Sequence, residues 1–187
     1  MRIIAGTLKG RRLVPPDWPG LRPSSDRLRE TLFNVLASRI VGARFLDLCA
    51  GTGAVGIEAL SRGAAAVTFV DEDPRACALI AKNLAGCRVT ERYTILRANA
   101  DQAGGTFRGT QSIVFLDAPY ADQHLDTLVN RAAECVASGG VLVVEHARRR
   151  ALTGQAGRLV QVRDLRSGDS CLSFFAESKT PGASDEE

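Results

Sequence analysis

Short, predominantly apolar runs alternate with helical patterns from residue 44 onward, and this alternation limits the possible folds more than any other feature. Five runs are expected to form strands: residues 45–49, 66–70, 93–96, 113–116 and 141–144. Between them, apolar residues recur at helical spacing in residues 55–62, 74–84 and 125–137. Strands that are apolar on both faces are typical of a parallel sheet covered by helices. The sequence therefore predicts a doubly wound, mostly parallel α/β fold.

The first residues follow a different pattern. Two short segments flank a turn at Lys9-Gly10, which is typical of a small basic hairpin, and a proline-rich link follows. Leu28, Leu32 and Leu36 then share one face of a predicted helix. Three residues can cap the start of this helix: Ser24, Ser25 or Asp26.

The end of the chain also departs from the alternation. Residues 159–165 and 171–176 bracket Ser167-Gly168-Asp169, which is a hairpin signal, so the sheet is expected to end in antiparallel strands. We expect three parts in the chain: a basic hairpin and linker in residues 1–23, the main α/β domain in 24–177 and a frayed acidic tail in 178–187.

Composition excludes several classes of protein. The chain has 187 residues, 45% hydrophobic and 24% charged, which is close to the average of globular proteins. No apolar stretch is long enough to span a membrane and residues 1–10 lack the apolar run of a signal peptide, so a cytoplasmic protein is expected. No sequence feature demands an oligomer, so a monomer is expected. The five cysteines are widely spaced and are expected to be reduced core thiols. No metal site is predicted, and His124 and His146 are expected at the surface.

The positive charge is concentrated near the start of the chain. The net charge is +3, but residues 1–44 hold nine Lys and Arg against three acidic residues. A basic N-terminal region favours a polyanionic partner. The alternative is that these are ordinary surface residues and that the excess of Arg over Lys reflects a GC-rich genome.

A glycine-rich turn follows the first predicted strand, in residues 47–56. In an open α/β sheet, ligands bind beyond the carboxyl ends of the strands. Gly51 and Gly53 allow the backbone to approach a ligand closely, and the helix that begins there favours an anionic or carboxylate-bearing group. Such a turn can also serve only to connect a strand tightly to a helix.

An acidic residue at the end of the second predicted strand supports a nucleotide-like ligand. Asp71 ends the second strand, 20 positions after Gly51, at the offset where a carboxylate accepts hydrogen bonds from ribose hydroxyls. Asp73 precedes Pro74 and is expected to cap the next helix. These features fit a dinucleotide, whose fingerprint includes Gly56, and they fit S-adenosylmethionine equally well.

The fourth strand leads into Asp117-Ala118-Pro119-Tyr120, and this motif favours S-adenosylmethionine over a dinucleotide. An exocyclic amine of a base is a poor nucleophile because its lone pair is delocalised into the ring. The Asp117 carboxylate and the Ala118 carbonyl can hold its two hydrogens and turn the lone pair toward a methyl donor, while Tyr120 stacks on the flipped base. The alternative is an Asp turn that ends a strand beside a core tyrosine.

These two motifs, residues 47–53 and 117–120, resemble those of the class I S-adenosylmethionine-dependent methyltransferases. Over nearly the whole chain, and most specifically in residues 22–34, the sequence is similar to the bacterial guanine-N2 methyltransferases of small-subunit ribosomal RNA. The resemblance implies transfer of one methyl group from S-adenosylmethionine to a guanine in ribosomal RNA or in the small subunit, and release of S-adenosylhomocysteine. It also implies a doubly wound sheet and an N-terminal hairpin that helps to hold RNA.

The resemblance also assigns roles to individual residues. The residues implied to contact the cofactor are Asp47 near its amino group, Ala50, Gly51 and Gly53 at its methionine part, Asp71 at the ribose, and Asn99 and Ala100 at the adenine. The implied catalytic residues are Asp117, Ala118, Pro119 and Tyr120. The residues implied to bind RNA are Arg2, Lys9, Arg11, Arg12, Arg22 and Arg27. In the family pattern a proline stands where this chain has Ala118.

Three other functions stay open at this point. A methyltransferase of the same fold can act on a different RNA amine or on a DNA amine. An NAD-dependent oxidoreductase would use the glycines and Asp71, but would leave residues 117–120 unexplained. A non-catalytic RNA-binding or assembly factor would use only the basic N-terminal residues, and would bind RNA with a steep salt dependence.

Overall fold

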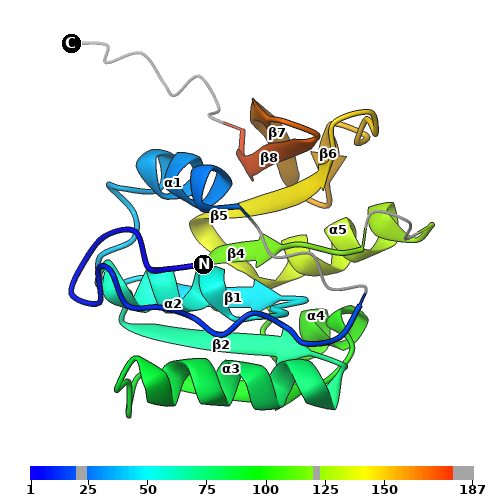
Figure 1. Ribbon diagram of the computed structural model, residues 1–187. Coiled ribbons are helices and arrows are strands. Elements are labelled where there is room, and N and C mark those ends of the chain that lie inside the picture. Colours follow the sequence, from blue (N-terminus) through cyan, green and yellow to red (C-terminus); the bar gives the residue numbers. More distant parts are fainter. Residues whose placement is uncertain (20–24, 120–122, 179–187) are drawn as a thin grey trace, which may run out of the picture.

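The computed structural model describes residues 1–19, 25–119 and 123–178. Within this part of the chain, eight strands form a single sheet in the order β3-β2-β1-β4-β5-β8-β7-β6 (Figure 1). The strands are β1 (Arg44–Leu48), β2 (Ala66–Asp71), β3 (Tyr93–Arg97), β4 (Gln111–Leu116), β5 (Val136–Ala147), β6 (Gln155–Ala156), β7 (Leu159–Ser167) and β8 (Ser170–Glu177). Strands β1 to β5 run parallel, and β8 is antiparallel to both β5 and β7. The predicted doubly wound fold with antiparallel final strands is confirmed.

The centre of the sheet lies at β1, which pairs with β2 on one side and with β4 on the other. The connections therefore reverse direction between β1 and β4, and the carboxyl ends of these two strands diverge into different loops. Residues Phe45, Leu46, Asp47 and Leu48 of β1 are all buried, as expected for a strand covered on both faces. Ligands bind at this kind of topological switch point.

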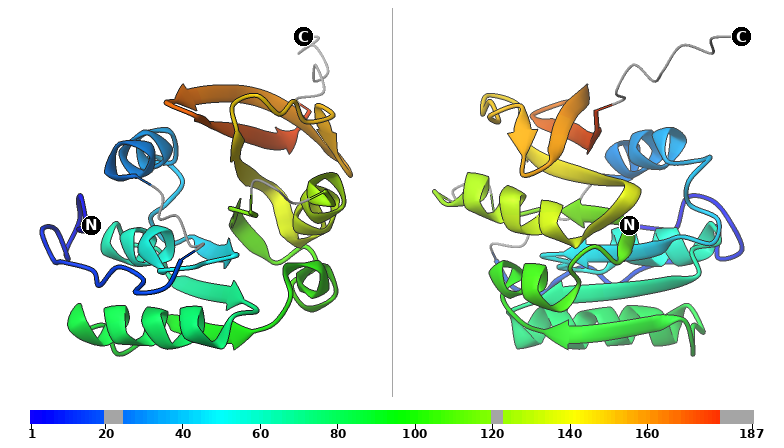
Figure 2. Two further views of the ribbon diagram at one scale, coloured as in Figure 1. Left: turned by 45° about the vertical axis from the view of Figure 1, so that its right-hand side comes forward. Right: turned by 180° about the vertical axis from the view of Figure 1, so that it is seen from behind.

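Helices cover both faces of the sheet (Figure 2). The described helices are α1 (Asp26–Val35), α2 (Ala54–Ser61), α3 (Pro74–Gly86), the 3-10 helix η1 (Ala100–Gln102), α4 (Ala103–Thr106) and α5 (Leu125–Cys135). One core joins α1, α2, α3 and the N-terminal segment to the sheet through Phe45, Phe69 and Phe115. A second core joins η1, α4 and α5 to the opposite face through Leu46 and Leu116. Alternate residues of each strand thus serve different cores.

Two helix caps form at residues that the sequence indicates, with Ser25 as one of the three candidates for α1. Ser25 caps α1, and its side chain accepts a hydrogen bond from the Leu28 amide at 3.1 Å. Asp73 caps α3 beside Pro74 and accepts from the Arg75 amide at 2.8 Å. Each side chain supplies an acceptor to an amide that has no partner within its helix.

The N-terminal segment forms a looser hairpin than the sequence predicts. A single antiparallel bridge joins Arg2 and Arg12, and no strand is formed. The reason is a competing acceptor, because the Ile4 and Ala5 amides donate to the Glu58 carboxylate of α2 at 2.8 and 2.9 Å. The segment is therefore attached to α2, with Ile3 buried in the first core.

Gly56 has a packing role in α2. A Cβ atom at this position would lie 2.2 Å from Cε1 of Phe69 in β2. The helix can approach the strand only because residue 56 has no side chain. Gly56 therefore explains how helix and sheet pack, and it gives no support to a dinucleotide over another ligand.

The expectation that His146 lies at the surface is wrong. Its side chain is buried in β5, with Nε2 2.8 Å from the Ser173 hydroxyl of β8. The burial arises because β5 extends to Ala147, well beyond the predicted strand, and pairs there with β8.

All five cysteines are free thiols, of which Cys49 and Cys77 are only partly buried. No helix in the described ranges is long and apolar enough to cross a membrane.

Candidate active site

A cavity of about 930 Å³ opens at the carboxyl ends of the parallel strands, at the switch point between β1 and β4. Its walls come from the residues that follow β1, β2, β3 and β4, from the start of α1 and from the β7–β8 turn. This volume lies within the range of small-molecule sites, which is about 300 to 1,000 Å³. The predicted residues that line it are Arg27, Asp47, Ala50, Gly51, Asp71, Asn99, Ala100, Asp117, Ala118 and Pro119.

The glycine-rich turn takes a backbone path that requires left-handed residues. Gly51 and Gly53 have φ angles of 54° and 73°, and Cys49 also has a positive φ of 58°. Gly53 does not line the cavity: it caps α2, and a Cβ there would lie 3.1 Å from Ile80. Gly51 does line the cavity. Of the two glycines, only Gly51 is therefore placed to contact a ligand there.

Asp71 fixes the turn that carries Gly51. One carboxylate oxygen accepts the Gly51 amide at 2.8 Å, and the other accepts the Asp73 amide at 2.9 Å. Each oxygen keeps a second lone pair, which can accept a hydrogen from a ligand hydroxyl. Asp71 can therefore position the loop and bind a ribose at the same time.

Asp47 is buried at the base of the cavity and is 1% exposed. Its carboxylate accepts the Gly56 amide at 2.9 Å. Burial raises the pKa of Asp47 to about 8, the Gly56 hydrogen bond opposes this shift, and the nearby Asp71 charge adds to it. A cationic ligand group beside Asp47 would favour the ionised carboxylate and lower its pKa.

We expect the raised pKa of Asp47 to make the ligand-free protein less stable as the pH rises. The folded pKa lies above the unfolded value of about 3.9, so the folded state holds the proton more tightly. Below about pH 4, Asp47 is protonated in both states and does not destabilise the fold. As the pH rises from there toward 8, the unfolded state loses this proton more readily, so the free energy of unfolding falls. Chemical denaturation at pH 5 and pH 8.5 should show a gain in free energy of unfolding for Asp47→Asn that is larger at pH 8.5. An equal effect at both pH values would contradict the shifted pKa.

The residues after β3 form the third wall. Asn99 caps η1 by accepting the Asp101 amide at 3.0 Å, and its amide nitrogen donates to the Glu72 carboxylate at 3.0 Å. Ala100 is 8% exposed and contributes apolar surface. Glu72 also lines the cavity, and sequence reasoning missed it although it follows Asp71 directly.

Asp117 lies at the end of β4, where its amide donates to the Leu48 carbonyl of β1 at 3.3 Å. The side chain of Asp117 is partly buried, Ala118 is 3% exposed, and Pro119 is exposed. Tyr120 is outside the described residues. Glu145 of β5 also lines the cavity and is 4% exposed. The cavity thus joins the Asp117 carboxylate to the glycine-rich turn.

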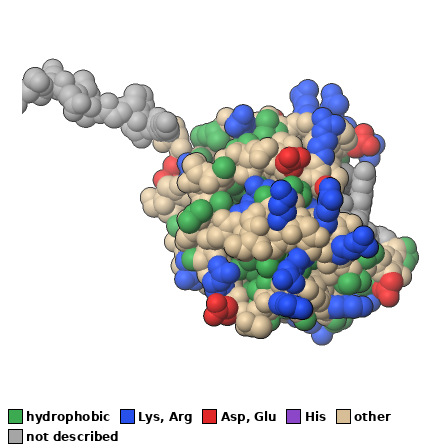
Figure 3. Space-filling view, turned by 60° about the vertical axis from the view of Figure 1, so that its left-hand side comes forward, with side chains coloured by type: hydrophobic (Ala, Val, Ile, Leu, Met, Phe, Trp, Pro, Cys, Tyr) green, Lys and Arg blue, Asp and Glu red, His purple; other side chains and the backbone are tan. Residues whose placement is uncertain are grey.

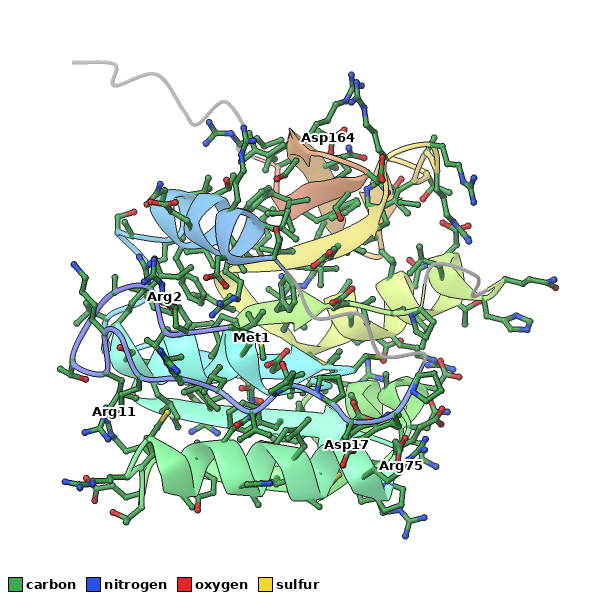
Figure 4. All side chains as sticks on the ribbon, in the orientation of Figure 1. Met1, Arg2, Arg11, Asp17, Arg75 and Asp164 are labelled. Atoms are coloured by element: carbon green, nitrogen blue, oxygen red, sulfur yellow. The ribbon has the colours of Figure 1, made fainter. Side chains whose placement is uncertain are left out.

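Most of the predicted RNA-binding residues lie away from this cavity. Arg27 lines it, whereas Arg22 is outside the described residues. Lys and Arg predominate over Asp and Glu on the face shown in Figure 3, which lies toward the amino ends of the parallel strands. Arg2 and Arg11 lie on that side, opposite the carboxyl ends of the strands (Figure 4). Lys9 and Arg12 belong to the same hairpin and do not line the cavity.

Sequence reasoning also missed the β7–β8 turn. Ser167, Gly168, Asp169 and Ser170 of this turn line the cavity, together with Ser25 at the start of α1. The hairpin itself was predicted, but its place at the site depends on β8 being inserted beside β5.

Known proteins resemble the chain over most of its length. A family model described as "Conserved hypothetical protein 95" matches residues 1–176. The chain is 37% identical over 172 residues to "Putative rRNA methyltransferase YlbH" of Bacillus subtilis (strain 168), which covers 87% of this chain and 91% of that protein. It is 43% identical over 130 residues to "Ribosomal RNA small subunit methyltransferase D" of Escherichia coli (strain K12), which covers 70% of this chain and 65% of that protein.

The fold comparison agrees with the sequence comparison. The solved structure titled "Putative methyltransferase yhhF from Escherichia coli" matches with a TM-score of 0.82 and 34% identity, over 96% of this chain and 99% of that chain. The sheet order, the cavity at the switch point and these relatives all indicate a methyltransferase fold. The chain therefore belongs to the conserved hypothetical protein 95 family, the family of ribosomal RNA small subunit methyltransferase D.

Proposed function

We propose that the protein transfers a methyl group from S-adenosylmethionine to the exocyclic N2 of a guanine in small-subunit ribosomal RNA. The observation that carries the proposal is that one cavity contains both the Asp117-Ala118 step and the glycine-rich turn held by Asp71. The names of two relatives, an rRNA methyltransferase and a ribosomal RNA small subunit methyltransferase, support RNA as the substrate. Such a substrate would place the enzyme in the cytoplasm.

The residues of the cavity fit S-adenosylmethionine, which carries a sulfonium and an ammonium group. Of the described residues that line the cavity, six are acidic and one, Arg27, is basic; the acidic residues are Asp47, Asp71, Glu72, Asp117, Glu145 and Asp169. An excess of negative charge favours a cationic ligand through its field. When bound, S-adenosylmethionine supplies an electrophilic methyl group.

Each wall of the cavity has a proposed part in holding the cofactor. Asp71 accepts hydrogen bonds from ribose hydroxyls with the lone pairs that the Gly51 and Asp73 amides leave available. Asp47 faces the amino group, while Asn99 and Ala100 contact the adenine. Gly51 and Ala50 allow close approach of the backbone to the methionine part.

Asp117 and Ala118 act on the second substrate. The Asp117 carboxylate and the Ala118 carbonyl accept the two hydrogens of the guanine N2 amine and orient its lone pair. Orientation of this kind replaces a bimolecular encounter by a positioned reaction. The start of α1 and the β7–β8 turn border the space where the base would enter.

Transfer of labelled methyl groups to small ribosomal subunits that lack the modification tests this function. We expect the label in N2-methylguanosine after nucleoside analysis, with naked RNA as a second substrate in parallel. Label found in another RNA nucleoside, or only in DNA, would mean that the enzyme methylates a different amine. Absence of label with protein that binds S-adenosylmethionine would contradict the ribosomal substrate.

A further inference from the structure

The charge distribution separates the catalytic cavity from the part of the protein that can attract RNA. Among the described residues that line the cavity, six are acidic and one, Arg27, is basic. Four of these acidic residues, Asp71, Glu72, Asp117 and Asp169, are exposed or partly exposed, and their carboxylates repel an RNA phosphate backbone because like charges oppose association. Among the described residues, a surface that attracts RNA through positive charge is therefore expected away from the cavity.

Positively charged residues gather at the amino ends of the parallel strands, opposite the cavity. Helices of a doubly wound fold run antiparallel to the strands, so the last residues of α2 and α3 lie beside the first residues of β1, β2 and β3. Residues 7–12, 42–44, 61–66 and 87–92 come together there and form what we call the basic edge. These segments hold seven basic residues, Lys9, Arg11, Arg12, Arg44, Arg62, Arg88 and Arg92, and one acidic residue, Glu91.

Hydrogen bonds between these segments show that they form one surface. The Thr7 and Leu8 amides donate to Ser61 at the end of α2. The Arg92 guanidinium donates to the Ala64 carbonyl at 3.2 Å. The Ala65 amide donates to the Ala43 carbonyl at 2.9 Å, next to Arg44.

The N-terminal hairpin is continuous with this surface. Arg11 lies close enough to Cys87 to lower the pKa of its thiol, against the larger effect of burial, and Arg88 is the next residue. Arg44, Arg88 and Arg92 are exposed. The basic edge therefore extends the positive charge of the hairpin across three strand ends, in the region where basic side chains predominate in Figure 3.

We propose that the basic edge binds the phosphate backbone of a helical RNA segment at a distance from the target base. This inference rests on the proposed RNA substrate, and adds Arg44, Arg88 and Arg92 to the residues that contact it. Cations arranged along an edge contact phosphates without reading sequence, and they position the RNA. The target nucleotide then reaches the acidic cavity because the RNA is held elsewhere.

The test is a triple variant, Arg44→Gln with Arg88→Gln and Arg92→Gln, measured for RNA binding over a range of salt concentrations. Loss of three phosphate contacts should reduce the slope of log affinity against log salt by about 2 to 3. We expect affinity for naked ribosomal RNA to fall at least about ten-fold near 0.1 M salt. The matched control removes three exposed arginines outside the basic edge, Arg75→Gln with Arg149→Gln and Arg163→Gln.

Each outcome either supports or overturns the basic edge. Affinity for S-adenosylmethionine should stay within two-fold, and the methyl-transfer rate at saturating RNA should be retained. An unchanged salt slope, or an equal loss in the control, overturns the proposal. Loss of binding to assembled subunits alone also overturns it, since the edge would then contact ribosomal protein. Failure of the proposed function is a separate result, because wild-type protein would then transfer no label.

Discussion

Replacement of Asp117 by alanine is expected to lower the rate of methyl transfer by about two to four orders of magnitude. The variant removes the carboxylate that we propose accepts a hydrogen of the target amine, and leaves the glycine-rich turn and Asp71 in place. Cofactor affinity should therefore change by a few-fold at most. Single-turnover transfer from labelled S-adenosylmethionine, together with calorimetric binding of the cofactor, measures the two effects separately.

Two further variants define how Asp117 acts. Asp117→Asn keeps the shape and one acceptor oxygen but loses the charge, so its rate should lie between those of wild type and Asp117→Ala. Asp126→Asn is the matched control, because Asp126 is an exposed residue of α5 outside the cavity. If Asp117→Ala retained more than a tenth of the wild-type rate, Asp117 would be a positioning residue only.

Glu58→Ala is expected to cause the largest loss of stability, about 3 to 5 kcal/mol of free energy of unfolding. Glu58 has no exposed surface and accepts hydrogen bonds from the Ile4 and Ala5 amides and from Arg62 Nε at 2.8 to 2.9 Å. It also lies 3.5 Å from Arg29 Nη1. Removal of the carboxylate would leave the Arg29 charge buried without its acidic partner in α2. Urea denaturation monitored by Trp18 fluorescence or circular dichroism measures the change.

The control for this prediction is Glu30→Ala, an exposed residue of α1 that should change stability by less than about 0.5 kcal/mol. Glu58→Gln keeps an acceptor for one backbone amide, so it should lower the free energy of unfolding by less than Glu58→Ala does. Arg29 has Nε and Nη1 buried without a hydrogen-bond partner, and Glu58 is its buried acidic partner, whereas Asp26, 2.7 Å from Nη2, is half exposed. A loss below about 1 kcal/mol for Glu58→Ala would show that water replaces the carboxylate after local rearrangement.

The strands and the main motifs were predictable because their signals are local. A run such as residues 113–116 is apolar at every position, and Asp117 follows it directly, so both the strand and the exit of the chain are visible in the sequence. The carboxyl ends of parallel strands meet at one edge, and this rule alone brings Asp47, Asp71 and Asp117 to one cavity.

The features that sequence reasoning missed depend on contacts between distant segments. Arg29 lies beside the apolar face of α1, and its buried guanidinium is held by Asp26 of the same helix, by the Arg2 carbonyl and by Glu58 of α2. Charged residues are almost never fully buried unless they are paired, so the helix pattern alone favours exposure. His146 and the β7–β8 turn were misjudged for a related reason, since both positions follow from the insertion of β8 beside β5.

The position of the cavity between β1 and β4 has a consequence for how the protein acquires its ligand during folding. The walls require that β1 pair with β2, which is near in the sequence, and with β4, which is far away. Distant pairings form late because they close long loops. A chain that has formed only the β1–α2–β2 unit has the glycine-rich turn and Asp71 but lacks the walls that follow β3 and β4. Cofactor at a hundred times its dissociation constant, which stabilises a folded protein by about 2.7 kcal/mol, therefore favours the completed centre of the sheet over every partly paired form.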